Sequence, residues 1–218
     1  MNEKELFDRM TNELYTAVIC DALDEVGYRN QSLKSGIVPL DHNWVVTGRA
    51  KTIHAVDVSE VHGNPYDKEI KAVDSIKENE VVVVCTNDSE KSGIWGELLS
   101  TAAKVRGGRG AIVDGLIRDS KKIIDMNFPV FTKGMNPLDS QGRTYVIDYD
   151  VAVTCGGVTI YPNDVIFADR DGIAVIPHAV LNEVLDKAFR KVNRENSTRD
   201  ELLAGKYLQD VYDKYGVL

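Results

Sequence analysis

Short apolar runs alternate with helical patterns through the centre of the chain. Residues 81–85 (VVVVC) form a continuous apolar run, which is typical of a strand that is covered on both faces. The residues that follow predict a helix over 96–105, a strand over 111–113, a helix over 120–126 and a strand over 129–132. This alternation predicts parallel β-α-β units with right-handed crossovers.

The segments on either side of this centre predict helices at both ends and a second half rich in strands. Residues 1–30 contain two helical patterns, and a further helix is expected over 66–76 with Ile70, Val73 and Ile76 on its buried face. Alternating or β-branched segments predict strands over 37–38, 44–46, 50–56, 144–153, 158–160, 165–168 and 173–176.

The end of the chain is predicted to be helical. Residues 178–191 place apolar side chains on one helical face, and a charged helical tail follows over 194–218. We therefore expect a single α/β domain over residues 1–218, with N-terminal helices in 1–30 and a C-terminal helical extension in 178–218.

Composition and charge narrow the classes of function. The 34 acidic residues outnumber the 26 basic ones, and the net charge of −8 repels a phosphate backbone, so we expect no nucleic-acid partner. No apolar run approaches the roughly 20 residues that a membrane-spanning helix needs. The polar start of the chain has no secretory pattern, so we expect a cytoplasmic protein without a membrane partner.

The three cysteines are expected to be ordinary buried thiols. Cys20, Cys85 and Cys155 lie far apart, show no C-x-x-C pairing and sit within apolar stretches.

Two loops carry the residues with the clearest chemistry. Loops that leave the carboxyl ends of parallel strands meet at one edge of the sheet, where α/β folds bind their ligands. If strands 81–85 and 111–113 are neighbours, Glu97 and the pair Arg118-Asp119 face one pocket.

The residue types in these loops suit a small oxo acid and a metal ion. The backbone amides of Gly96, Glu97, Leu98 and Leu99 at a helix start form a cradle for a carboxylate. Arg118 offers a planar set of donors that matches a carboxylate or an enolate oxygen. Asp119 is a hard oxygen ligand for Mg²⁺ or Mn²⁺.

Each of these residues, taken alone, also has a structural explanation. Asp119 fits a helix N-cap, Arg118 a surface ion pair, and Glu97 an interaction with the helix dipole. A Schiff-base aldolase is a competing hypothesis, because Lys104, Lys121 and Lys122 lie near these residues. Lys121 and Lys122, however, open a helix on its polar face, whereas a nucleophilic lysine needs an apolar pocket that lowers its pKa, so we interpret these lysines as solvated surface charges.

The combination of these residues resembles a known family. The stretch WGELLSTAAKVRGGRGAIVDGLIRD (95–119) is similar to the core motif of the RraA-like proteins, in which an acidic residue precedes Arg-Asp by twenty residues, as Glu97 does here. Further similarity lies in DALDEVG (21–27), GRAKT (48–52) and CGGVTIYPNDVIFADRDGIAVIP (155–177).

The resemblance implies a swivelling β/β/α-type fold and a metal-dependent class II aldolase. Such an enzyme cleaves 4-hydroxy-2-oxo diacids of the 4-hydroxy-4-methyl-2-oxoglutarate type to pyruvate and also decarboxylates oxaloacetate. The divalent cation is Mg²⁺ or Mn²⁺. Because the family includes a regulator that binds an RNA-degrading enzyme, a non-catalytic regulatory protein is the alternative function.

The resemblance also assigns roles to residues. It implies Asp119 as the metal ligand, Arg118 as a catalytic and substrate contact, and Gly96 to Leu99 as the carboxylate cradle. Glu97 stands where the aldolases usually carry aspartate and is expected to take part in catalysis. Glu195 matches a glutamate that reaches the metal through water from an adjacent subunit, so a homotrimer or homohexamer with sites between subunits is expected.

Overall fold

The computed structural model describes residues 2–61 and 63–217. Its centre is a nine-stranded sheet in the order β1-β6-β5-β3-β2-β10-β11, in which β4 also pairs with β5 and β7 with β2. The four parallel strands at the middle of this order are β2 (Val46–Asp57), β3 (Glu80–Cys85), β5 (Gly110–Ile117) and β6 (Val130–Met135). The predicted parallel centre of the chain is therefore confirmed.

Helices connect these parallel strands, as the alternation predicted for β3, β5 and β6. They are α3 (Asp67–Asp74), α4 (Glu97–Val105) and α5 (Ser120–Asp125), which follow β2, β3 and β5 in turn. A short strand that the pattern did not predict, β4 (Gly93–Trp95), lies between β3 and α4 and pairs in parallel with β5.

Antiparallel strands extend the sheet at both ends: β1 (Val38–Pro39) at one end, and β10 (Val165–Asp169) and β11 (Gly172–Ile176) at the other. A further antiparallel strand, β7 (Thr144–Tyr149), pairs with the second half of β2. A separate two-stranded sheet consists of β8 (Val153–Cys155) and β9 (Val158–Ile160). The predicted strand 144–153 is thus divided between two sheets. The predicted strand 50–56 lies within the longer β2, which has partners along its whole length, whereas of the predicted strand 44–46 only Val46 belongs to β2.

The two faces of the parallel strands are buried in different clusters. In β3, Val82 and Val84 pack in one cluster beneath α3, α4 and α5, whereas Val81 and Val83 pack in another with residues of β8, β9 and β11. The run at 81–85 is accordingly buried on both faces. One layer of helices and two of β structure give the expected β/β/α class of mixed α/β fold.

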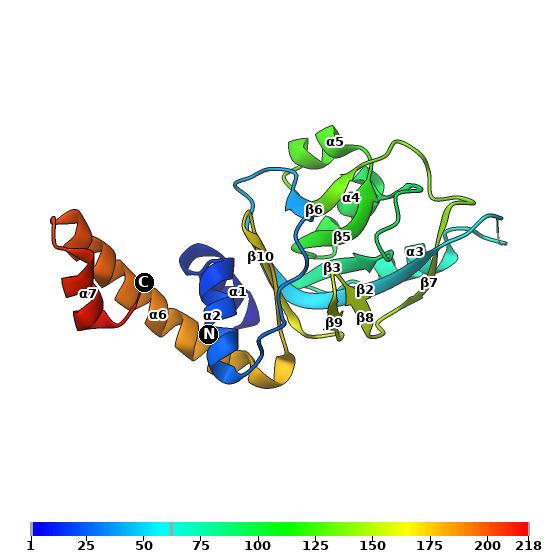
Figure 1. Cartoon of the computed structure of the whole chain (residues 1–218). Coiled ribbons are helices and arrows are strands. Elements are labelled where there is room, and N and C mark those ends of the chain that lie inside the picture. The colour runs from blue at the N-terminus through cyan, green and yellow to red at the C-terminus, as the bar shows by residue number, and fades with distance from the viewer. Residues whose placement is uncertain (1, 62, 218) are drawn as a thin grey trace.

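Helices from both ends of the chain meet at the far end of the sheet (Figure 1). They are α1 (Glu3–Glu13), α2 (Thr16–Val26), the 3₁₀ turn His178–Val180 and the first half of α6 (Leu181–Leu203). Apolar side chains of these helices form a third cluster against β10 and β11, which includes Phe167 and Ile176.

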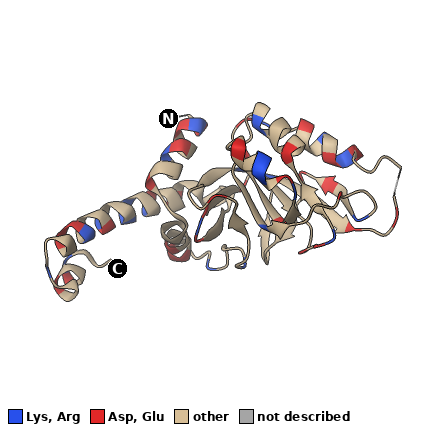
Figure 2. Cartoon of the chain, turned by 90° about the horizontal axis from the view of Figure 1, so that it is seen from above, with Lys and Arg blue, Asp and Glu red and all other residues tan. Residues whose placement is uncertain are grey.

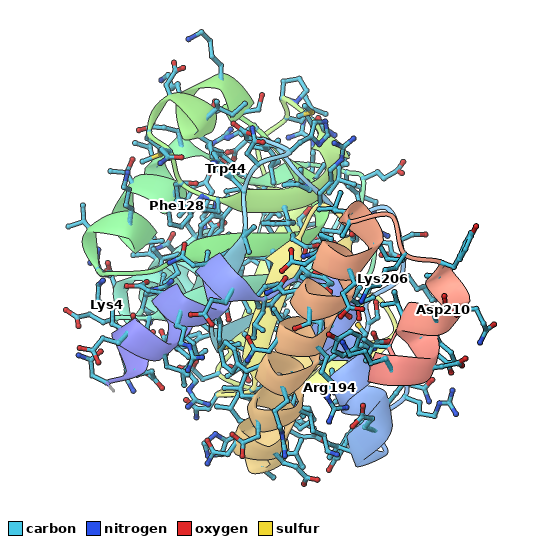
Figure 3. The ribbon with its side chains drawn as sticks, turned by 90° about the vertical axis from the view of Figure 1, so that its left-hand side faces the viewer. Lys4, Trp44, Phe128, Arg194, Lys206 and Asp210 are labelled. Atoms are coloured by element: carbon cyan, nitrogen blue, oxygen red, sulfur yellow. The ribbon has the colours of Figure 1, made fainter. Side chains whose placement is uncertain are left out.

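The rest of α6 and α7 (Leu208–Tyr215) form a helical arm, residues 189–217, which projects away from the sheet (Figure 1). Thr198 is the only buried residue of α6 beyond Ala188. Basic and acidic residues are interspersed along this arm (Figure 2). Figure 3 shows Arg194, Lys206 and Asp210 on it, apart from Trp44 and Phe128 of the body. Among the described residues no helix is long and apolar enough to cross a membrane.

A truncation within β5 tests this arrangement of the core. Ile112 is fully buried between the packed layers, so we expect Ile112→Ala to lower the free energy of unfolding by about 2–5 kcal/mol. Val105→Ala, at a side chain that is 81% exposed, should change it by less than about 0.5 kcal/mol. Urea denaturation of both variants checks this, and equal losses would contradict the assignment of the core.

Candidate active site

The start of α4 and the end of β5 lie side by side because β3 and β5 are adjacent parallel strands. β4 pairs with the end of β5, and the Arg118 amide donates a 2.9 Å hydrogen bond to the Trp95 carbonyl oxygen. The two loops that the sequence singled out therefore converge.

Glycine at position 96 makes this approach possible. A Cβ atom there would lie 2.9 Å from Asp119 Oδ2 and 3.2 Å from Arg118 Cγ. The first distance is shorter than real Cβ contacts, so any larger side chain at Gly96 would push the Asp119 carboxylate away from α4.

Asp119 occupies the N-cap position of α5 without capping that helix. Its φ of 59° lies in the left-handed region, and its side chain makes no capping hydrogen bond to α5. Asp119 Oδ2 instead accepts a 3.3 Å hydrogen bond from the Glu97 amide, the first amide of α4. The unfavourable backbone conformation thus directs the carboxylate to the start of the neighbouring helix.

Arg118 is oriented by a second carboxylate that the sequence did not single out. Its Nη1 lies 2.9 Å from Asp139 Oδ1, and its Nε lies 3.9 Å from Asp119 Oδ2. The Tyr66 hydroxyl donates a 2.5 Å hydrogen bond to Asp139 Oδ2. Burial acts to raise the pKa of Asp139, but hydrogen bonds from Tyr66 and Gln141 and the charge of Arg118 outweigh it and hold that pKa below its usual range.

These groups surround a cavity of about 320 Å³. Its polar wall is formed by Tyr66, Glu69, Arg118, Asp119, Asp139 and Ser140, and its apolar wall by Ile70, Ile94, Leu98 and Leu99. The structure therefore brings together Gly96, Leu98, Leu99, Arg118 and Asp119 of the residues that the sequence singled out. Ile70, which was predicted to face the core, is 49% exposed and lies at this cavity instead, so that part of the helix prediction was wrong.

Glu69 is the titratable side chain of this cavity with the largest change in acidity. It is partly buried on α3, and burial together with the nearby Asp139 carboxylate raises its pKa from 4.5 to about 7, against the opposing effect of Arg118. The amphipathic pattern of this helix did not predict that Glu69 lines the cavity or that its pKa is raised.

Two glutamates that were predicted to belong to the site, Glu97 and Glu195, do not line this cavity within the single chain. The Glu97 carboxylate accepts a 3.0 Å hydrogen bond from the Thr101 hydroxyl on its own helix. Glu195 lies on the arm in a different cavity, where the Tyr15 hydroxyl donates a hydrogen bond to it and burial raises its pKa. The roles of both glutamates stay predictions.

The donors at the cavity suit a hard divalent cation. Asp119 presents a carboxylate oxygen beside the cavity, and Mg²⁺ keeps several waters and needs only one or two protein carboxylates. A second, fully buried group of ligand atoms, Cys85, Asp114 and Cys155, lies elsewhere in the fold and offers softer donors.

The raised pKa of Glu69 predicts how stability depends on pH. Because its pKa in the folded chain exceeds the unfolded value of 4.5, its contribution is fully present below pH 4.5 and is lost as the pH rises to about 7. The difference in unfolding free energy between the wild type and Glu69→Gln should therefore fall across this window. Urea denaturation in EDTA measures it, with the exposed Glu78→Gln as the matched control, and a flat difference for Glu69→Gln would refute the prediction.

Known proteins share both the sequence and the fold of this chain. A protein of Halalkalibacterium halodurans that is provisionally named 4-hydroxy-4-methyl-2-oxoglutarate aldolase is 34% identical over 193 residues, which cover 87% of each chain. Protein DlpA of Legionella pneumophila is 30% identical over 200 residues, which are 92% of this chain but only 32% of DlpA.

A solved structure is also similar to this chain in both fold and sequence. RraAS2 of Streptomyces coelicolor, described as an unusual member of the RNase ES inhibitor RraA protein family, matches with a TM-score of 0.80 and 32% identity. The match covers 91% of this chain and 97% of RraAS2. The family model named RraA-like, with the description Aldolase/RraA, matches residues 16–175. Since this match spans most of the chain, the chain belongs to the RraA-like family, as the sequence motifs predicted.

Proposed function

We propose that this chain is a divalent-metal-dependent carbon–carbon lyase. Its substrates are 4-hydroxy-2-oxo diacids of the 4-hydroxy-4-methyl-2-oxoglutarate type, which it cleaves to pyruvate, and it also decarboxylates oxaloacetate. The observation that carries the proposal is the convergence of the α4 amides, Arg118 and Asp119 on one cavity. The name of the Halalkalibacterium relative supports the same reaction.

Different groups at the cavity bind different parts of the substrate. The amides at the start of α4 bind its carboxylate, because the first amides of a helix have no acceptor within the helix. Asp119 would hold Mg²⁺ or Mn²⁺, which would supply Lewis-acid polarisation of the 2-oxo carbonyl. Arg118, kept in place by Asp139, donates to the oxygen on which the enolate charge develops.

Proton transfers start and end the cleavage. Through a bound water, the carboxylate of Glu97 or of Glu195 of an adjacent subunit takes the proton from the distal hydroxyl, which becomes a carbonyl as the carbon–carbon bond breaks and its electron pair enters the enolate of pyruvate. Glu69, whose pKa is about 7, then gives a proton to the enolate carbon. The first carboxylate releases its proton to the solvent and Glu69 takes one up, which restores both groups. Loss of carbon dioxide from oxaloacetate leaves the same enolate, so one site serves both reactions.

The proposed site is completed by a second copy of the chain in a homotrimer or homohexamer. Glu195 lies on the arm and lines a cavity other than that of Arg118 and Asp119 in its own chain. The arm also exposes large apolar side chains, which are suited to burial against a neighbour: Leu203, Tyr207, Leu208 and Tyr212. To reach the neighbouring site, the Glu195 carboxylate must release the Tyr15 hydroxyl.

A regulatory protein without catalysis is the second candidate function. The observation in its favour is the likeness to RraAS2, which belongs to a family described as RNase inhibitors. If the purified chain with Mg²⁺ or Mn²⁺ released pyruvate from neither substrate, this candidate would replace the lyase.

Substitutions at the end of β5 test the roles of the two central residues. We expect Asp119→Asn to lose both metal dependence and turnover, whereas Arg118→Ala should still bind Mn²⁺ but lose at least about 100-fold in kcat, because a donor to the developing charge is missing. A pyruvate-release assay and Mn²⁺ binding measure these effects. Asp125→Asn, at the other end of α5, is the matched control, and wild-type rates in Asp119→Asn would place the site elsewhere.

Mixing two inactive variants tests the shared site. Asp119→Asn and Glu195→Gln should each be inactive alone. After subunit exchange in a head-to-tail ring, roughly a quarter of the cavities should combine an intact Asp119 with an intact Glu195 of the neighbouring subunit. The mixture should therefore recover roughly a quarter of the wild-type activity. No recovery, with mixed oligomers verified by mass spectrometry, would show that Glu195 does not act between subunits.

A further inference from the structure

A compact group of buried ligand atoms lies away from the cavity of Arg118 and Asp119. Cys85 ends β3, Asp114 lies within β5 and Cys155 ends β8, and none of the three is more than 1% exposed. One ligand atom from each lies within 4.8 Å of the other two. Within residues 2–61 and 63–217 this is the only group of three such side chains.

Hydrogen bonds hold the Asp114 carboxylate with one oxygen directed at the sulfur atoms. The Thr86 amide and hydroxyl donate to Asp114 Oδ1 at 2.5 Å and 2.7 Å. Asp114 Oδ2 lies 3.5 Å from Cys85 Sγ, which in turn lies 2.6 Å from the Thr154 carbonyl oxygen. Two sulfur atoms and a carboxylate oxygen thus lie close enough together to share one cation, and the Thr154 carbonyl oxygen beside Cys85 Sγ offers a further donor.

The charges in this group favour a cation. None of the ion pairs found among the described residues gives the buried Asp114 carboxylate a basic partner. A divalent cation bound here would supply the opposite charge that this carboxylate lacks, and a coordinated thiol loses its proton, so both cysteines would bind as thiolates.

The position of the group also gives a bound ion a structural role. The hairpin of β8 and β9 forms its own two-stranded sheet, and such a hairpin is only marginally stable by itself. Cys155 belongs to this hairpin, whereas Cys85 and Asp114 belong to the main sheet. One ion bound to all three would fasten the hairpin to the main sheet.

We propose that Cys85, Asp114 and Cys155, with the carbonyl oxygen of Thr154, form a structural site for a thiophilic divalent cation, of which Zn²⁺ fits best. Binding replaces the thiol protons of Cys85 and Cys155, which pass to the solvent, and forms two metal–sulfur bonds without any change of oxidation state. This site is independent of the lyase site, where the donors are hard oxygens.

Cobalt reports thiolate ligands directly and therefore serves as the probe. The full-length chain is refolded from urea with Co²⁺ under reducing conditions, because the group is buried in the folded state. We expect about one equivalent of Co²⁺ to give a thiolate-to-cobalt charge-transfer band in the near ultraviolet. Zn²⁺ should displace it and should raise the urea midpoint of the wild type.

Matched variants identify which cysteines give the cobalt band. Cys85→Ser and Cys155→Ser should each lose most of the band, whereas Cys20→Ser, which changes the cysteine outside the group, should keep it. Asp119→Asn should also keep it, which separates this site from the lyase site. A wild type without the band, or a band that survives Cys155→Ser, would overturn the proposal.

X-ray absorption on the zinc-loaded wild type covers the case in which the serine variants fail to fold. The expected first shell of the zinc contains two sulfur atoms and two lighter atoms. A shell of nitrogen and oxygen alone would also overturn the proposal.

Discussion

The close approach of Asp119 to the start of α4 is the contact on which the proposed chemistry depends. It exists because β3 and β5 pair in parallel, so that the loops after both strands leave from the same edge of the sheet. It also requires a residue without a side chain at position 96 and a left-handed backbone at Asp119. Together these features place a carboxylate, a guanidinium and the first amides of a helix around one cavity.

The balance of charge in that cavity follows from the same geometry. Among the described residues that line the cavity, Arg118 is the basic one, and it faces three acidic residues, Glu69, Asp119 and Asp139. Such an excess of carboxylates can be relieved by a proton or by a cation. The raised pKa of Glu69 corresponds to the first response, and the proposed metal at Asp119 to the second.

The sequence predicted the parts of this account that depend on local pattern. The apolar run at 81–85 and the helical patterns after it identified the parallel strands, and the spacing of Glu97 from Arg118-Asp119 identified the two loops that converge. The spacing could not predict the direction of the Glu97 side chain, which bonds to Thr101 on its own helix. Side-chain direction at a helix start is decided by neighbours that the sequence does not show.

Other parts depend on contacts between segments far apart in the chain. Tyr66, Glu69 and Asp139 carry no motif, and they meet Arg118 only because α3 and the segment after β6 border the same cavity. β4 has three residues, too few for a recognisable pattern. Cys85 and Cys155 were correctly predicted to be buried, but their proximity arises only when β8 packs against the main sheet.

The most direct measurement of the central claim is a crystal structure with Mn²⁺ and oxalate, a planar mimic of the pyruvate enolate. The account predicts an anomalous peak for Mn²⁺ at coordination distance from an Asp119 carboxylate oxygen. It also predicts one oxalate carboxylate against the first amides of α4 and an oxalate oxygen facing Arg118. A peak at another group of ligands, or oxalate bound away from this cavity, would contradict it.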